Sequence, residues 1–166
     1  AEVAQDRRLQ VRERGVPDDH LISFDTRNAP FDNPKVRQAL LMALDRNYVQ
    51  KVVYQGLGKV MESAFNSNLA WAHNSDVKLS AMYPFNPEKA KALLDEAGLK
   101  AGANGRRFDL RLVYDSTDAS RDRLSQVLQA MWGRIGVRVV FEGSTRNVQL
   151  KQVFTDWNFD ATLQAY

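Results

Sequence analysis

Carboxylates and histidines are the side chains of this chain from which acid–base chemistry could be built. Asp115 and Asp118 stand three residues apart, and two carboxylates at such a spacing can act as general acid and general base. The same residues, however, follow a strand-like segment and precede an amphipathic one, where Asp is typical of a helix cap. Capping is therefore the main interpretation of the pair, and a hydrolase built on Asp115, Asp118 and His73 is a competing hypothesis.

Motifs of the common enzyme and cofactor classes are absent from the sequence. Ser144 follows Gly143 without the flanking glycines of a nucleophile elbow, and neither His20 nor His73 has an H-E-x-x-H context. The chain has no cysteine, which excludes disulfides and thiolate–metal sites. No Walker A sequence or dinucleotide fingerprint occurs. We therefore predict a protein that is not an enzyme and that uses no cofactor and no metal.

Charge and hydropathy restrict the classes of partner. The chain has 166 residues, a formal net charge of +3 and a hydrophobic content of 44%, as expected for a globular domain. Arg7, Arg8, Arg12 and Arg14 form a basic arm, but acidic residues interrupt it and no aromatic platform accompanies it. Nucleic-acid binding is therefore not predicted. No run of 18 apolar residues exists, so no segment is expected to span a membrane.

Asparagine–proline pairs mark two helix starts before residue 90. Asn33 and Asn86 each precede a proline, which combines an N-cap residue with a favoured first helical residue. Asp45 is expected to cap a third helix. The predicted helices cover residues 34–44, 46–55 and 87–97, and Tyr48 and Val52 are expected to face the core.

From residue 108 onward, strand and helix signals alternate, which indicates an α/β arrangement with right-handed crossovers and parallel strands. The predicted strands cover residues 108–114, 137–141 and 159–166, with an earlier strand at 20–26. The intervening helices are expected to bury Leu124, Val127, Leu128, Met131 and Ile135 in one case, and Leu150, Val153, Phe154 and Trp157 in the other.

The whole chain is predicted to form one α/β domain over residues 1–166, with a mixed, mostly parallel sheet flanked by helices. Strands are expected within residues 1–27, including a short one at 9–13, and a long irregular loop over 56–80. Loops of this length in compact domains are usually functional or wrap another part of the protein. Trp71 lies in this loop, where no helical periodicity accounts for it, and is a candidate for a ligand or interface contact.

In open α/β sheets, ligands bind beyond the carboxyl ends of the strands. Here those ends are the turn over residues 115–118, the turn over residues 143–147, and Tyr166. Polar side chains at these three places are therefore the candidates for a binding site.

Four segments resemble family 5 of the bacterial extracellular solute-binding proteins, the peptide-type binding proteins of ABC importers. They are Asn28-Ala-Pro-Phe-Asp-Asn-Pro-Lys-Val-Arg-Gln-Ala-Leu-Leu-Met-Ala-Leu-Asp-Arg46, Pro87-Glu-Lys-Ala-Lys-Ala-Leu-Leu-Asp-Glu-Ala-Gly98, Trp132-Gly-Arg-Ile-Gly-Val-Arg-Val139 and Asn158-Phe-Asp160. Each segment alone is weakly specific, but their order and spacing together are specific, and the resemblance extends from about residue 17 to residue 166.

The resemblance implies one lobe of a type II periplasmic binding protein fold, with this chain as the core of the second lobe and the first lobe missing. The whole protein would capture a peptide, or a similar small polar solute, between two lobes and deliver it to ABC permease subunits. It would reside in the periplasm or at the outer cell surface, and would meet the membrane only through the permease or through a lipid anchor outside this chain.

By position, the resemblance implies ligand contacts in the loops that follow the strands. The residues concerned are Ser116, Asp118, Ser120, Arg121, Arg146 and Asn147, with Tyr166 at the last strand end and Trp71 in the long loop. Peptide-type members often have a tryptophan near the position of Asn147, and this chain has none there. The alternative interpretation is a stand-alone α/β module that docks on a protein partner through residues 56–80, which the length of the native chain would distinguish.

Overall fold

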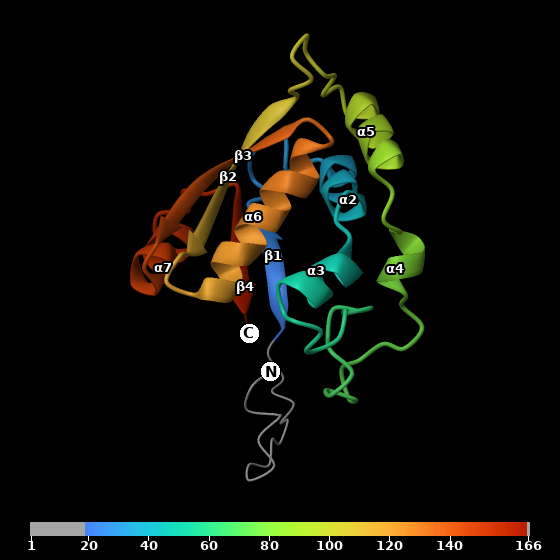
Figure 1. Ribbon diagram of the computed structural model, residues 1–166, viewed down its shortest axis with the longest axis vertical. Coiled ribbons are helices and arrows are strands. Elements are labelled where there is room, and N and C mark those ends of the chain that lie inside the picture. Colours follow the sequence, from blue (N-terminus) through green and yellow to red (C-terminus); the bar gives the residue numbers. More distant parts are fainter. Residues whose placement is uncertain (1–18, 166) are drawn as a thin grey trace.

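The computed structural model describes residues 19–165, so the strand predicted at residues 9–13 and the candidate Tyr166 lie outside the described residues. Four strands form one sheet in the order β1-β4-β2-β3 (Figure 1). They are β1 (His20–Phe24), β2 (Phe108–Asp115), β3 (Val137–Ser144) and β4 (Ala161–Ala165). β2 pairs in parallel with both β3 and β4, whereas β1 pairs antiparallel with β4. The predicted mixed, mostly parallel sheet is confirmed.

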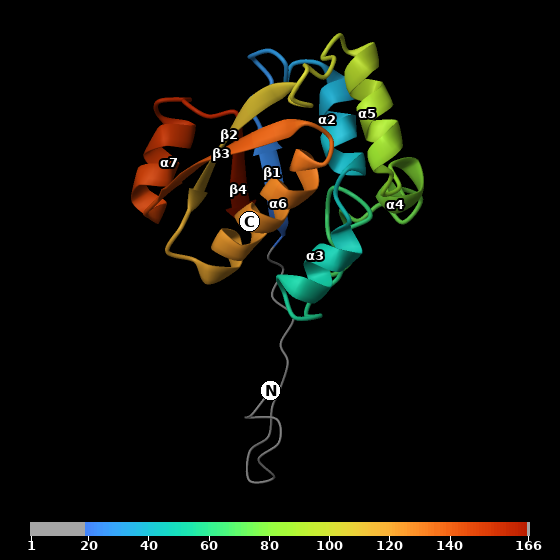
Figure 2. The same cartoon turned by 45° about the horizontal axis from the view of Figure 1, so that its top comes forward.

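Two helices make the crossovers between the parallel strands, and they cover opposite faces of the sheet (Figure 2). The helix α6 (Ala119–Gly133) connects β2 to β3, and α7 (Arg146–Phe154) connects β3 to β4. Along β2, Leu112 belongs to the large core on the α6 side, whereas its neighbour Val113 packs with Val153 and Phe159 in a small cluster on the α7 side. This alternation is expected for a strand buried on both faces.

Three of the four helices described between β1 and β2 begin at the predicted caps. The four are α2 (Pro34–Met42), α3 (Arg46–Val52), the single-turn α4 (Leu79–Met82) and α5 (Pro87–Glu96). The side chains of Asn33, Asp45 and Asn86 each accept a hydrogen bond from a backbone N–H in the first turn of α2, α3 and α5, respectively. These local hydrogen bonds explain why three helix starts could be predicted from residue type alone.

Some predicted core positions are wrong. Tyr48, Val52, Phe154 and Trp157 are all between 44% and 50% exposed. In α7 the buried positions are Gln149 and Val153, and the helix ends at Phe154, so Trp157 lies beyond it with a positive φ of 52°. Its ring instead stacks with Arg27, whose guanidinium carbon is 4.2 Å from the ring centroid.

Between α3 and α4, residues 53–78 form neither helix nor strand. His73 lies within this segment and its Nδ1 atom is 3.0 Å from Ser63 Oγ and 2.8 Å from the carbonyl oxygen of Phe65. These contacts tie the loop to itself. His73 therefore holds the loop together locally, as a structural histidine does.

A buried carboxylate anchors the segment that leaves β1. Asp25 is 3% exposed, and its carboxylate accepts hydrogen bonds from Arg27 Nε at 2.8 Å, from Arg27 Nη2 at 2.7 Å and from Asn28 Nδ2 at 3.0 Å. These bonds, those from Arg27 first, hold the pKa of Asp25 below its ordinary value of 3.8. Its backbone N–H also donates to Asp160, which joins this turn to the start of β4.

Replacing Asp25 with asparagine is expected to destabilise the fold by about 1–3 kcal/mol at neutral pH, because the charged partner of Arg27 is lost. Since the folded-state pKa is lowered, the contribution of Asp25 is present above the unfolded-state value and is lost as pH falls below it. The difference in stability between the wild type and Asp25→Asn should therefore be constant above about pH 3.8 and shrink as pH falls below it, toward the lower pKa of the folded state. Urea unfolding of both proteins across pH 3 to 7 measures this, and a constant difference over that range would contradict it.

Candidate functional site

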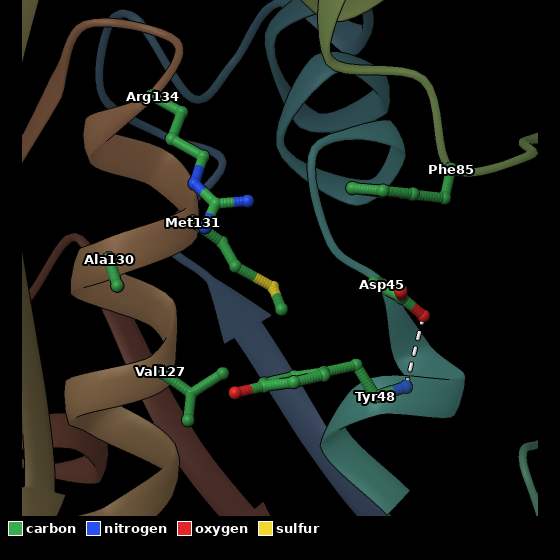
Figure 3. A pocket seen from close by; sticks show the side chains of 7 residues that line it. All are labelled: Asp45, Tyr48, Phe85, Val127, Ala130, Met131 and Arg134. Atoms are coloured by element: carbon green, nitrogen blue, oxygen red, sulfur yellow. Dashed lines mark hydrogen bonds between the residues drawn. The ribbon is translucent and has the colours of Figure 1, made fainter.

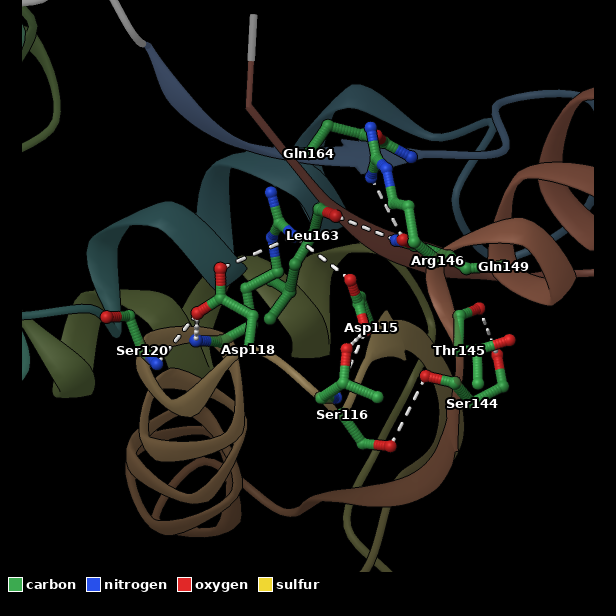
Figure 4. A network of polar contacts seen from close by, with 12 residues as sticks. Asp115, Ser116, Asp118, Ser120, Ser144, Thr145, Arg146, Gln149, Leu163 and Gln164 are labelled. Atoms are coloured by element: carbon green, nitrogen blue, oxygen red, sulfur yellow. Dashed lines mark hydrogen bonds and ion pairs between the residues drawn. The ribbon is translucent and has the colours of Figure 1, made fainter.

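The carboxyl ends of β2, β3 and β4 meet at one edge of the sheet, where polar side chains from all three join in a network (Figure 4). After β2, the backbone N–H of Ser116 donates to the carbonyl oxygen of Ser144 at 2.9 Å, and its hydroxyl lies 3.3 Å from the same oxygen. At the start of α7, Arg146 bonds to Gln164 of β4. We call the network the strand-end cluster; it comprises Asp115, Ser116, Thr117, Asp118, Arg121, Ser144, Arg146, Gln149, Thr162 and Gln164.

The turn after β2 is organised by two carboxylates. Asp115 is 5% exposed and accepts hydrogen bonds from the backbone N–H and the hydroxyl of Thr117, at 3.0 and 2.6 Å. Asp118 caps α6 by accepting from the backbone N–H groups of Ser120 and Arg121, at 2.8 and 3.1 Å. The capping interpretation of Asp118 is confirmed. Ser120 contributes its backbone N–H to this cap.

Arg121 lies between the two carboxylates and balances their charge. Its Nη1 atom is 3.5 Å from Asp115 Oδ2 and 3.5 Å from Asp118 Oδ2, and its side chain is 12% exposed. Its Nε atom is buried without a hydrogen-bond acceptor in the described part of the chain. Buried donors are almost always paired in folded proteins. Arg121 is thus an ion-paired arginine that keeps one donor unused.

Arg146 is held in a different way, by two uncharged amides. Its Nη1 atom donates to Gln149 Oε1 at 3.0 Å and to Gln164 Oε1 at 3.2 Å. Gln149 is fully buried and Gln164 is 2% exposed. The interior of this part of the site is therefore polar and uncharged, and it fixes the position of one arginine.

The remaining predicted residues lie apart from these contacts. Asn147 is exposed on the first turn of α7, and its side chain makes no hydrogen bond with another residue of the described part. Trp71 is 85% exposed in the irregular segment, and none of the contacts that join the strand ends involves it. The structure thus brings Ser116, Asp118, Arg121 and Arg146 together and leaves Trp71 outside.

Three buried polar residues of the strand-end cluster were not predicted: Gln149, Thr162 and Gln164. A signal for each was present in the sequence. Gln149 stands four residues before Val153, which places both on one face of a helix. Thr162 and Gln164 stand two residues apart in a strand, so both point to the α7 face of the sheet. A polar face on the strand opposite a polar position on the helix indicates a buried network.

In the part of the chain that the structure describes, His73 takes its hydrogen-bond partners from its own loop and not from the carboxylates of the strand-end cluster. The competing hydrolase hypothesis requires a contact between His73 and Asp115 or Asp118. Among the described residues His73 contacts Ser63 and Phe65 instead. Within residues 19–165, no three His, Asp or Glu side chains gather in a way that could hold a metal ion. In the same range, no helix is long and apolar enough to cross a membrane.

A separate pocket of about 200 Å³ lies between α3, the residues before α5, and α6 (Figure 3). The rings of Tyr48 and Phe85 line it together with Met131 and Arg134. It follows the second half of α6, whereas the strand-end cluster lies at the start of that helix, and no predicted site residue lines it. In Figure 3 the ring of Tyr48 extends from α3 toward Val127 on α6, and it stays half exposed there.

Comparison with known proteins gives the same family over the whole chain. The family model described as bacterial extracellular solute-binding proteins, family 5, middle, matches residues 1–166. Heme-binding protein A of Haemophilus influenzae is 35% identical over 138 residues, which are 83% of this chain and 24% of that protein. The dipeptide-binding protein of Escherichia coli is 33% identical over 142 residues, which are 83% of this chain and 25% of that protein. The chain thus spans about a quarter of the length of these relatives.

Solved structures agree in fold. The oligopeptide-binding protein AppA of Bacillus subtilis, in complex with a nonapeptide, superposes with a TM-score of 0.81 at 27% identity, covering 90% of this chain and 31% of that one. The dipeptide-binding protein of Pseudoalteromonas sp. SM9913, in complex with Met-Leu, gives a TM-score of 0.82 at 27% identity, covering 99% of this chain and 31% of that one. The mixed sheet with helices on both faces is that of type II periplasmic binding proteins.

Proposed function

We propose that this chain, which belongs to family 5 of the bacterial extracellular solute-binding proteins, forms part of the solute-binding component of an ABC importer. In this proposal the chain is the core of the second of two lobes. The strand-end cluster is its contribution to a site for a peptide or a similar small polar solute, and the protein has no enzymatic activity.

The observation that carries the proposal is the convergence of three strand ends on one polar cluster. Ligands of open α/β sheets bind at such edges. Ser116, Asp118, Arg121 and Arg146 offer hydroxyl, carboxylate and guanidinium groups, which match the amides and charged ends of peptides. Two of the solved structures similar to this chain hold a nonapeptide and Met-Leu, respectively, which supports a peptide as the solute.

Capture would follow from closure of two lobes around the solute. A ligand that contacts both lobes only in the closed form shifts the open–closed equilibrium by its difference in affinity for the two forms. The closed form would then be the one that an ABC permease receives. In this proposal the protein works in the periplasm or at the cell surface, and it meets the membrane through the permease or a lipid anchor.

Isothermal titration calorimetry of the natural full-length protein with a series of di-, tri- and pentapeptides tests the proposal. We expect at least one length class to bind with a Kd of about 0.1–10 μM. The 166-residue chain alone should bind the same peptide at least about 100-fold more weakly, because one lobe supplies only part of the contacts and cannot close.

Two results would count against the proposal. Equal affinity of the chain and the full-length protein would contradict the two-lobe mechanism. Absence of peptide binding to the full-length protein would overturn the peptide assignment. Haemin should be titrated in parallel, since one relative is named a heme-binding protein, and tight binding of haemin without peptide binding would replace the peptide by haem as the solute.

A further inference from the structure

We propose that Arg146 binds a carboxylate group of the solute, so that the site selects anionic solutes over their neutral analogues. This inference rests on the proposed function, because it names the chemistry that one part of the strand-end cluster recognises. Its basis is the difference between the two arginines that the structure brings to the strand ends.

The charge of Arg121 is used within the protein, whereas that of Arg146 is not. Arg121 lies 3.5 Å from each of two carboxylates. Arg146 forms no ion pair with any carboxylate between residues 19 and 165, and its protein partners there are the amide oxygens of Gln149 and Gln164. The positive charge of Arg146 is therefore uncompensated, and an anion from outside these residues can pair with it.

The two glutamines hold Arg146 without neutralising it. The Nε2 atom of Gln149 donates to Thr162 Oγ1 at 3.0 Å and to the carbonyl oxygen of Leu163 at 2.8 Å. These donations turn the amide oxygen of Gln149 toward the guanidinium. A buried aspartate or glutamate at either position would have bound the arginine more strongly, but it would also have cancelled the charge.

The edge of the Arg146 guanidinium formed by Nε and Nη2, which the glutamines do not contact, is the edge suited to a carboxylate. Both contacts to the glutamines are made by Nη1, and Nε and Nη2 donate to no other residue between 19 and 165. Two adjacent N–H groups of an arginine bind a planar carboxylate through a pair of parallel hydrogen bonds. Arg146 is also the first residue of α7, where the positive end of the helix favours an anion, and Thr145 makes no side-chain cap there.

Affinity measurements on the natural full-length protein test the inference, with matched peptides that differ in one carboxylate. Ala-Ala-Ala is compared with its C-terminal amide, and Ala-Glu-Ala with Ala-Gln-Ala, so that the main-chain carboxylate and a side-chain carboxylate are tested separately. For one of the two pairs, we expect the wild type to bind the carboxylate peptide about 10- to 100-fold more tightly than its neutral analogue.

Arg146→Gln is expected to weaken binding of the carboxylate peptide more than binding of its neutral analogue, so that the preference is abolished. Arg146→Lys keeps the charge but not the paired hydrogen bonds, and should retain part of the preference. Arg134→Gln is the matched control, since it removes the same charge at the far end of α6, about 20 Å along that helix from its start. Thermal unfolding of each variant verifies that the fold is retained.

The outcomes separate this inference from the proposed function. If peptides bind but neither pair is discriminated, or if Arg146→Gln keeps the preference, the inference is overturned and the proposed function stands. If no peptide binds, the peptide assignment is overturned, and the same variants are compared on sugar acids and the corresponding neutral sugars. In that case an Arg146-dependent preference for the acid supports the inference, and its absence overturns it.

Discussion

Replacing Trp132 with alanine is expected to destabilise the fold by about 3–5 kcal/mol, the largest effect that we predict for a single substitution. Trp132 is 1% exposed in the middle of the large core, and its ring lies 6.4 Å from that of Phe24 on β1. Its Nε1 atom donates to the carbonyl oxygen of Leu40 at 3.0 Å, which joins α6 to α2. The alanine variant loses both the packing and this bond, and it leaves a large cavity.

Urea unfolding followed by circular dichroism measures the effect, and Trp132→Phe is the matched control. Phenylalanine keeps most of the apolar volume but cannot donate to Leu40, so it should cost about 1–2 kcal/mol. A typical domain is stable by only about 5–15 kcal/mol, so the alanine variant should be partly unfolded at 37 °C. A loss below 1 kcal/mol in the alanine variant would show that Trp132 is not buried as described.

Gly136→Ala is the second large effect, with an expected loss of about 2–5 kcal/mol. Gly136 has a φ of +86°, a conformation that side chains disfavour. A Cβ atom at this position would lie 2.5 Å from the carbonyl oxygen of Gly105 and 3.0 Å from Arg107 Cγ. Because the carbonyl oxygen of Gly136 accepts from Arg107 N at 2.8 Å, the two turns cannot separate without losing that bond.

A second glycine isolates the steric part of this loss. Gly98 has a φ of +82°, but a Cβ atom there would meet nothing within 4 Å. Gly98→Ala should therefore show only the conformational strain, about 1–2 kcal/mol. The same urea measurement applies to both variants. Similar losses for the two would mean that the turn at Gly136 relaxes freely and that the close approach to Gly105 is unimportant.

Much of the local structure could be predicted because its causes are local. The caps at Asn33, Asp45, Asn86 and Asp118 bond to backbone groups within three residues, so residue type and position are sufficient to locate the helix starts. Strand–helix alternation after residue 108 predicts parallel pairing, and hence that the turn after β2 and the turn after β3 lie at one edge. Ser116 and Ser144 meet there for this reason.

Which side chains become buried, and against which partners, depends on tertiary contacts that no local sequence pattern contains. Trp157 fits the helical spacing of its neighbours, but α7 ends before it and Arg27, which lies 130 residues away in sequence, contacts it instead. Likewise, the sequence alone did not indicate that Trp71 would be left outside the strand-end cluster.

The residue types and the family resemblance already determined an α/β binding domain with polar loops after its strands. Tertiary structure alone decided which of its arginines pairs with carboxylates and which with amides. The placement of β4 beside β2, with α7 above it, brings Gln164 and Gln149 to Arg146, while the turn into α6 brings Asp115 and Asp118 to Arg121. Ion pairing depends on distances of a few ångströms between residues far apart in sequence, so spacing along the chain could not distinguish the two arginines.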